Sequence, residues 1–89
     1  MQWSERTVPK KIGPGQVRTW FARTDESSCI IHERDDGHFT LDAWSRDNQT
    51  NLSGTPFVFP SLEQAQVFAD RLMDHRPDQW ERLVAEDLV

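Results

Sequence analysis

The clearest pattern of hydrophobic and polar positions lies in the second half of the chain. Residues 57–59 form a short apolar run that Pro60 ends, and Ser61 followed by Gln64 matches the side-chain pattern that begins a helix. Beyond it, apolar residues recur at helical spacing within an arc of about 140°. They are Leu62, Ala65, Phe68, Ala69, Leu72 and Met73. The pattern predicts a brief edge strand followed by an amphipathic helix that ends near His75.

Three segments in the first half alternate in the way typical of strands. Residues 17–24, 28–34 and 38–46 are rich in β-branched and aromatic side chains and are separated by turn-forming residues. Residues 47–55 are a polar loop. The breaker cluster in Lys-Lys-Ile-Gly-Pro-Gly makes residues 1–15 an arm or extended segment rather than a helix.

The turn before the third strand fixes the register. A three-residue loop with Gly37 in the left-handed conformation pairs Ile31 with Leu41, and the preceding four-residue turn then places Arg18 opposite Glu33. One face of the sheet becomes apolar: Trp20, Ala22, Cys29, Ile31, Phe39, Leu41 and Ala43. The other face is mixed: Phe21, Arg23, Ile30, His32, Arg34, His38, Thr40, Asp42, Trp44 and Arg46. A shift by one residue would invert the two faces.

The expected fold is a single α+β domain over residues 1–89. It consists of a three- to four-stranded antiparallel meander with one face covered by the amphipathic helix. After Pro77, helical spacing of Trp80, Leu83 and Val84 predicts a short second helix at the C-terminal end, giving the order β-β-β-(β)-α-α.

Composition narrows the classes of function. The 89 residues have a formal net charge of −5, which disfavours non-specific binding to nucleic acid or anionic membranes. The only cysteine, Cys29, excludes an internal disulfide. No apolar stretch reaches the ~18 residues that span a bilayer, so we expect a cytoplasmic protein with no membrane partner.

The sequence offers no convincing catalytic or cofactor site. Cys29 and His32 are three residues apart on a strand and therefore point to opposite faces. His32, His38 and Asp42 share a face and could ligate a metal, but Arg34 lies opposite His38 and would oppose a cation. We therefore expect no cofactor, no metal ligands and no enzymatic activity, with a metal-dependent enzyme as the third alternative.

Two surfaces are candidates for binding a partner. The outward side of the predicted helix is acidic and suits a basic protein; it comprises Glu63, Val67, Asp70 and Asp74. The mixed sheet face is the second, and its candidate residues are Phe21, Arg23, His32, Arg34, Trp44 and Arg46. If neither the N-terminal arm nor the second helix covers that face, its apolar side chains require a partner or a homodimer. The leading hypothesis is a small acidic protein that binds another protein as an adaptor, an inhibitor or a regulatory subunit, as phage- or plasmid-encoded antagonists do.

The alternative is a nucleic-acid-binding module that uses the sheet face and the Lys10-Lys11 arm. Arginine and aromatic side chains on an open sheet can contact phosphates and stack on bases. The element order, with 57–65 as the step from strand into helix, resembles the small β-β-β-α DNA-binding modules of some phage and transposon integrases. Those modules are strongly basic, whereas this chain is acidic.

Overall fold

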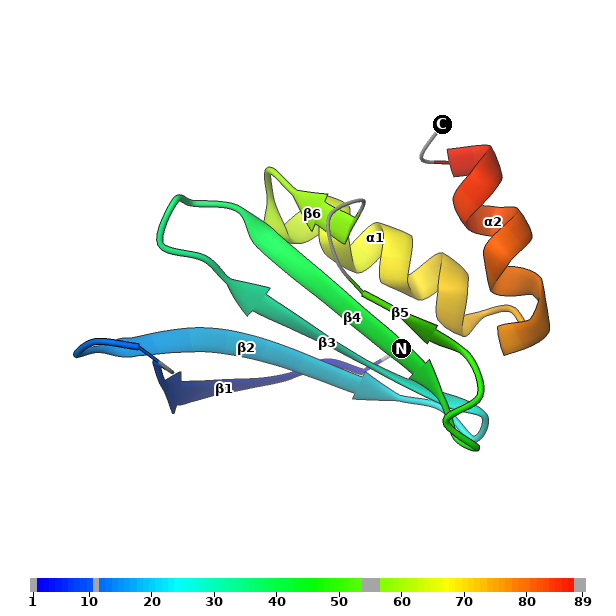
Figure 1. Cartoon of the computed structure of the whole chain (residues 1–89), viewed down its shortest axis with the longest axis horizontal. Helices are drawn as coiled ribbons and strands as arrows, with labels where there is room; N and C mark the ends of the chain where they lie inside the picture. Colours follow the sequence, from blue (N-terminus) through cyan, green and yellow to red (C-terminus); the bar gives the residue numbers. More distant parts are fainter. Residues whose placement is uncertain (1, 11, 54–56, 88–89) are drawn as a thin grey trace.

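The computed structural model describes residues 2–10, 12–53 and 57–87 (Figure 1). The strands are β1 (Ser4–Pro9), β2 (Gln16–Arg23), β3 (Ser27–Glu33), β4 (Phe39–Ser45), β5 (Asn51–Leu52) and β6 (Val58–Phe59). The helices are α1 (Leu62–Met73) and α2 (Trp80–Asp87), with a short 3-10 turn at Pro77–Gln79 before α2. The α+β class predicted from the sequence is confirmed.

The strands form one antiparallel sheet in the order β1-β2-β3-β4-β5, and β6 also pairs with β4. The predicted meander is therefore correct, but the predicted number of strands is too low. The additional strands are β1, within the segment expected to be an arm or extended, and β5, within the expected polar loop. β1 is polar and exposed along most of its length, so its composition gives little sign of a strand. It is held by its pairing with β2, where the Thr19 hydroxyl donates to the Arg6 carbonyl oxygen at 3.2 Å.

The predicted register is confirmed in both central hairpins. Ile31 pairs with Leu41 on β4 and with Trp20 on β2. Gly37 has φ +85°, the left-handed conformation that its turn requires. Arg18 and Glu33 form the expected cross-strand ion pair at 2.5 Å. The hydrogen bond from Arg18 lowers the pKa of Glu33, and the same pair raises the pKa of Arg18.

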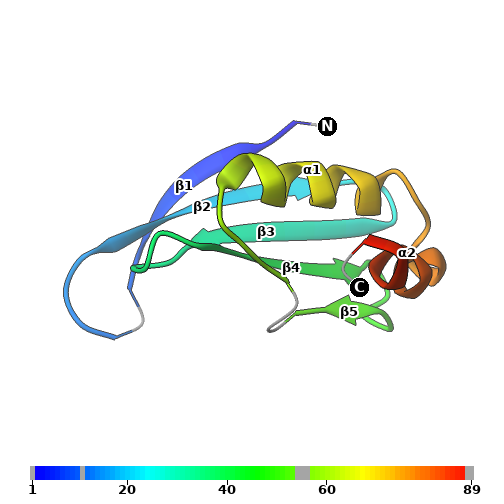
Figure 2. The ribbon, with the colours of Figure 1, turned by 90° about the horizontal axis from the view of Figure 1, so that it is seen from above.

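Helix α1 packs on the predicted apolar face of the sheet, which we call the covered face (Figure 2). The Ser61 hydroxyl accepts a hydrogen bond from the Gln64 amide at 3.2 Å and begins the helix. Ile31 and Leu41 are 0% and 1% exposed beneath α1, and Phe68 and Leu72 are 7% and 0% exposed. The hydrophobic stripe of the helix and the apolar side of the sheet thus form one core.

Helix α2 extends the same core at the C-terminal end of α1. Trp80 is fully buried, and Leu83 is buried beside it. Both helices lie on the same side of the sheet (Figures 1 and 2). Within the described residues, the opposite side of the sheet therefore has no helix on it.

Candidate partner-binding surfaces

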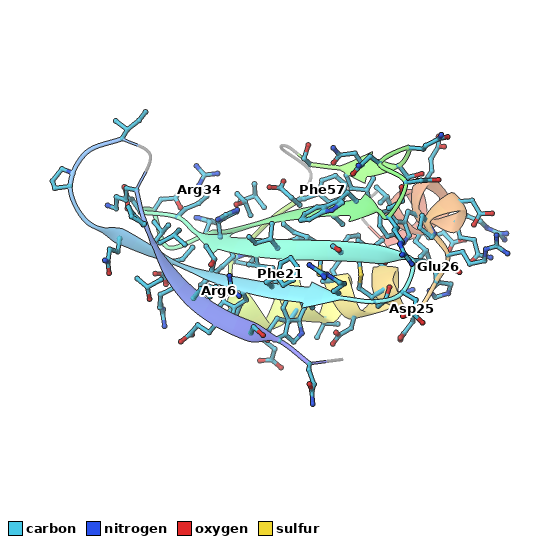
Figure 3. All side chains as sticks on the ribbon, turned by 90° about the horizontal axis from the view of Figure 1, so that it is seen from below. Arg6, Phe21, Asp25, Glu26, Arg34 and Phe57 are labelled. Carbon is cyan, nitrogen blue, oxygen red and sulfur yellow. The ribbon has the colours of Figure 1, made fainter. Side chains whose placement is uncertain are left out.

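The mixed side of the sheet, which we call the open face, is uncovered in the part of the chain that the structure describes. Figure 3 looks onto this side, with the sheet in front of both helices. The N-terminal segment could have covered it, but residues 4–9 instead extend the sheet as β1. The second helix could also have covered it, but α2 packs on the other side. The open face is therefore available to a partner.

Strand pairing sets the order of side chains across the open face. The central row is formed by Phe21, Ile30 and Asp42, which are register partners on β2, β3 and β4. Toward the β2–β3 turn, the next row is Arg23, Ser28 and Trp44. Toward the other end, the row is Arg6, Thr19, His32, Thr40 and Val58. Thr19 is only 3% exposed, so its neighbours enclose it without a helix above.

Aromatic surface on the open face is concentrated in its centre and at the end near the β2–β3 turn. Phe21, Ile30 and Trp44 are all half-buried, although both described helices, α1 and α2, lie on the other side of the sheet. The Arg23 guanidinium lies 5.3 Å from the centre of the Phe21 ring, so it stacks on an aromatic surface. These residues combine apolar area with positive charge.

The positively charged residues of the open face fall into two groups, those with an acidic partner and those without one among the described residues. Arg34 contacts the Asp36 carboxylate at 3.1 Å, and Lys10 contacts Asp35 at 2.7 Å, so both cations are neutralised within the chain. The backbone amide of His38 also donates to Asp36, and this hydrogen bond lowers the pKa of that carboxyl group.

Arg6, Arg23 and Arg46 have no acidic partner among the described residues. They are the positive charges of this surface that an outside group can neutralise.

The predicted sheet-face residues therefore do not form one site. Phe21, Arg23, Trp44 and Arg46 gather at the end near the β2–β3 turn, where they line a recess of about 520 Å³. We call this recess the Ser28 hollow, because Ser28 lies between Arg23 and Trp44 in the same row.

His32 and Arg34 line a separate groove of about 600 Å³ at the opposite end of the open face. Asp35, Asp36 and Asp42 line the same groove. Its charges are mixed, so it offers no clear preference for the charge of a ligand.

Two candidate binding residues of the open face, Arg6 and Ser28, were missing from the sequence analysis. Arg6 was missed because the strand that presents it is polar and was not recognised. Ser28 was missed because a small side chain suggests no chemistry by itself. Its place opposite Trp44 followed from the predicted register and could have indicated a recess.

The acidic side of helix α1 is less uniform than expected. Glu63 and Asp74 are exposed, and Val67 is 55% exposed. Asp70 is half-buried, and its Oδ1 is buried with no hydrogen-bond partner among the described residues. The predicted set of four is thus three surface residues and one that is partly enclosed.

The described residues contain no group of three or more His, Cys, Asp or Glu side chains that could hold a metal ion. Cys29 is fully buried on the covered face, and burial raises the pKa of its thiol to about 12. His32 points to the other face, so these two residues do not form a dyad. Helices long and apolar enough to cross a membrane are absent from the described ranges.

Comparisons of this chain with models of protein families, with curated proteins and with solved structures return no match.

Proposed function

We propose that this protein acts by binding another protein through the open face of its sheet, as an adaptor, an inhibitor or a regulatory subunit. The observation that supports this most directly is the group formed by Phe21, Ile30 and Trp44. These side chains are half-buried on a face that neither helix covers. Aromatic residues flanked by arginine are the side chains most enriched at the centres of protein interfaces.

The acidic side of α1 is the weaker candidate surface. Its one apolar residue, Val67, is flanked by exposed Glu63 and Asp74. Exposed carboxylates on a helix also serve solubility alone, and a single valine offers little area to bury. We therefore assign partner binding to the open face of the sheet, with the acidic side of α1 facing solvent.

Nucleic-acid binding is the second candidate, because Arg6, Arg23 and Arg46 have no acidic partner among the described residues and Arg23 stacks on the Phe21 ring. Against it stand the formal net charge of −5 and Asp42 in the centre of the face. A polyanion would have to approach an acidic protein, which weakens long-range attraction.

The proposal includes no turnover and no cofactor. It also places the protein in the cytoplasm, as the sequence analysis expected. The free thiol of Cys29, enclosed in the core, fits a reducing compartment.

Affinity capture from a lysate of the source cells tests the proposal. The wild-type protein, Trp44→Ala, Phe21→Ala, Val67→Ser and Arg82→Gln are each tagged and compared after nuclease treatment. We expect a protein retained by the wild type to be lost with Trp44→Ala and Phe21→Ala and kept with the other two variants. Thermal unfolding of each variant confirms that the fold persists.

Two results would contradict the proposal. If Val67→Ser removes the captured protein and Trp44→Ala does not, the partner binds the helix. If capture disappears after nuclease treatment, the retained protein was bridged by nucleic acid.

A further inference from the structure

Resting on the proposed function, we propose that the Ser28 hollow is the subsite for one acidic residue of the partner protein together with an adjacent large apolar side chain. The hollow lies on the open face near the β2–β3 turn. It is the part of that face where aromatic surface, unneutralised arginine and a depression coincide.

The shape of the hollow follows from the sequence of β3. Neighbouring strands lie about 4.8 Å apart, so equivalent positions on β2 and β4 are separated by about 10 Å. Between Arg23 and Trp44, the residue on β3 is Ser28, whose short side chain leaves this space unfilled. In the adjacent row, Ile30 fills the equivalent position. A single side chain of a partner can therefore lie over Ser28, with the Trp44 ring on one side and the stacked Phe21 and Arg23 on the other.

The charges of the hollow define the second part of its ligand. Arg23 and Arg46 both line it, and neither has an acidic partner among the described residues. Arginine binds carboxylates through paired, charge-assisted hydrogen bonds. A carboxylate placed beside the apolar side chain would therefore neutralise one or both guanidinium groups. The required ligand combines an aspartate or glutamate with a leucine or an aromatic residue.

A discrete carboxylate fits the surroundings better than a run of phosphates. Asp25 also lines the hollow, Glu26 is exposed in the same turn, and Asp42 lies one row away. A nucleic-acid backbone that crosses the sheet would bring successive negative charges against these carboxylates. A peptide can present one acidic residue to Arg23 and Arg46 and neutral residues elsewhere. Charge complementarity thus favours a protein segment as the occupant.

Nuclear magnetic resonance titration of the full chain tests this subsite directly. The probe is the hexapeptide acetyl-Ser-Glu-Leu-Phe-Glu-Ser-amide, and its matched controls replace both Glu with Gln or both apolar residues with Ser. Trp44 is the only one of the four tryptophans on the open face, so its indole N–H signal reports on the site. We expect the acidic peptide to shift this signal and the Ser28 amide, with a dissociation constant of about 1 mM. Each control should bind at least about fivefold more weakly.

Variants of the hollow sharpen the test. Ser28→Leu fills the space without changing the charge and should abolish the shifts, whereas Thr7→Leu on the edge strand should leave them unchanged. Arg23→Gln and Arg46→Gln should each weaken binding about five- to tenfold, with Arg82→Gln on α2 as the charge-matched control. Shifts that persist in Ser28→Leu, or the absence of any shift with the acidic peptide, would overturn the subsite.

The oligonucleotide dT12 is the competing probe. If it shifts the Trp44 and Ser28 signals at lower concentration than the peptide, with steep loss on adding salt, the occupant is nucleic acid and the inference is wrong. Failure of the subsite is distinguishable from failure of the proposed function. A partner lost with Trp44→Ala but retained by Ser28→Leu would leave the open face as the interface and remove only the hollow.

Discussion

The indole N–H of Trp80 donates a hydrogen bond to the carbonyl oxygen of Leu72 at 2.8 Å, in the interior of the protein. Leu72 belongs to the last turn of α1, where carbonyl groups are short of donors, and its carbonyl oxygen also accepts a hydrogen bond from the His75 amide at 3.1 Å. The first residue of α2 thereby completes the end of α1. The same side chain fills the core, since Trp80 is 0% exposed.

Substitution of Trp80 should separate these two contributions. Trp80→Phe keeps most of the buried ring and removes this donor, while the His75 amide still donates to the Leu72 carbonyl, so we expect a loss of about 1 kcal/mol in the free energy of unfolding. Trp80→Ala also creates a cavity and should cost about 3–5 kcal/mol, a large part of the stability of a domain this small. Urea denaturation followed by far-ultraviolet circular dichroism measures both. A Trp80→Phe variant as stable as the wild type would contradict a role for the hydrogen bond, and equal losses for the two variants would contradict a separate role for the buried ring.

Substitution of Gly37 tests the turn that sets the register. At φ +85° a side chain is strained, although nothing lies within 4 Å of the added Cβ. Gly37→Ala should therefore lower the free energy of unfolding by about 1 kcal/mol through backbone strain alone. Gly37→Asn should lose less, because asparagine tolerates this conformation better than alanine. A destabilisation by Asn equal to that by Ala, measured by chemical denaturation, would argue against a left-handed Gly37.

Acid should weaken the fold partly through Glu33. Its pKa is lowered below the ordinary value of 4.5, first by the hydrogen bond from Arg18. A lowered folded-state pKa stabilises the protein above the unfolded pKa, and this contribution disappears as the pH falls below 4.5 through the folded value. Because the pair is largely exposed, the effect is small and should decrease with added salt.

Thermal unfolding midpoints between pH 7 and pH 3 test this prediction. Glu33→Gln should reduce the dependence of the midpoint on pH below 4.5. Glu63→Gln is the control, since this exposed residue of α1 forms no ion pair with Arg18 in the described part of the chain and should leave the profile unchanged. A Glu33→Gln profile that parallels the wild type would show that the pair contributes nothing.

Reaction of Cys29 should report on global unfolding. The thiol is 0% exposed and its pKa is raised to about 12, mainly by burial, so thiolate is scarce at neutral pH. We expect the folded protein to resist a thiol-specific disulfide reagent at pH 8 and to react fully in denaturing urea. Trp80→Ala should accelerate the reaction about tenfold for each ~1.4 kcal/mol of stability lost. Rapid labelling of the folded wild type would contradict the packing of Cys29 beneath α1.

The sequence predicted the fold best where burial makes apolar residues recur at a regular spacing. Between Trp20 and Ala43, the alternation of apolar and polar residues predicted the register, because one side of these strands is buried. The helical spacing of apolar residues identified α1 for the same reason. β1 has no such pattern, since its side chains are mostly exposed and its pairing with β2 is a matter of backbone hydrogen bonds. β5 has only two residues within a polar segment.

The candidate surface followed the same rule. The alternation of side chains along a strand assigned Phe21 and Trp44 to the mixed face. This alternation gives no information about which side chains on that face contact one another. Arg23 and Trp44 gather around Ser28, and Arg34 pairs with Asp36. Both arrangements depend on side-chain conformations, which the spacing of apolar residues does not predict. The enclosure of Asp70 on α1 is of the same kind.

Because both helices lie on one side of the sheet, alternate residues of each strand have different roles. Those facing the helices form the core, and those between them form the open face. On β3, Cys29 and Ile31 lie in the core, while Ser28 and Ile30 alternate with them and face outward. Neighbouring residues along the chain are therefore free to change for different reasons. Substitutions at alternate positions can therefore change the chemistry of the open face without redesigning the interior that holds the strands in place.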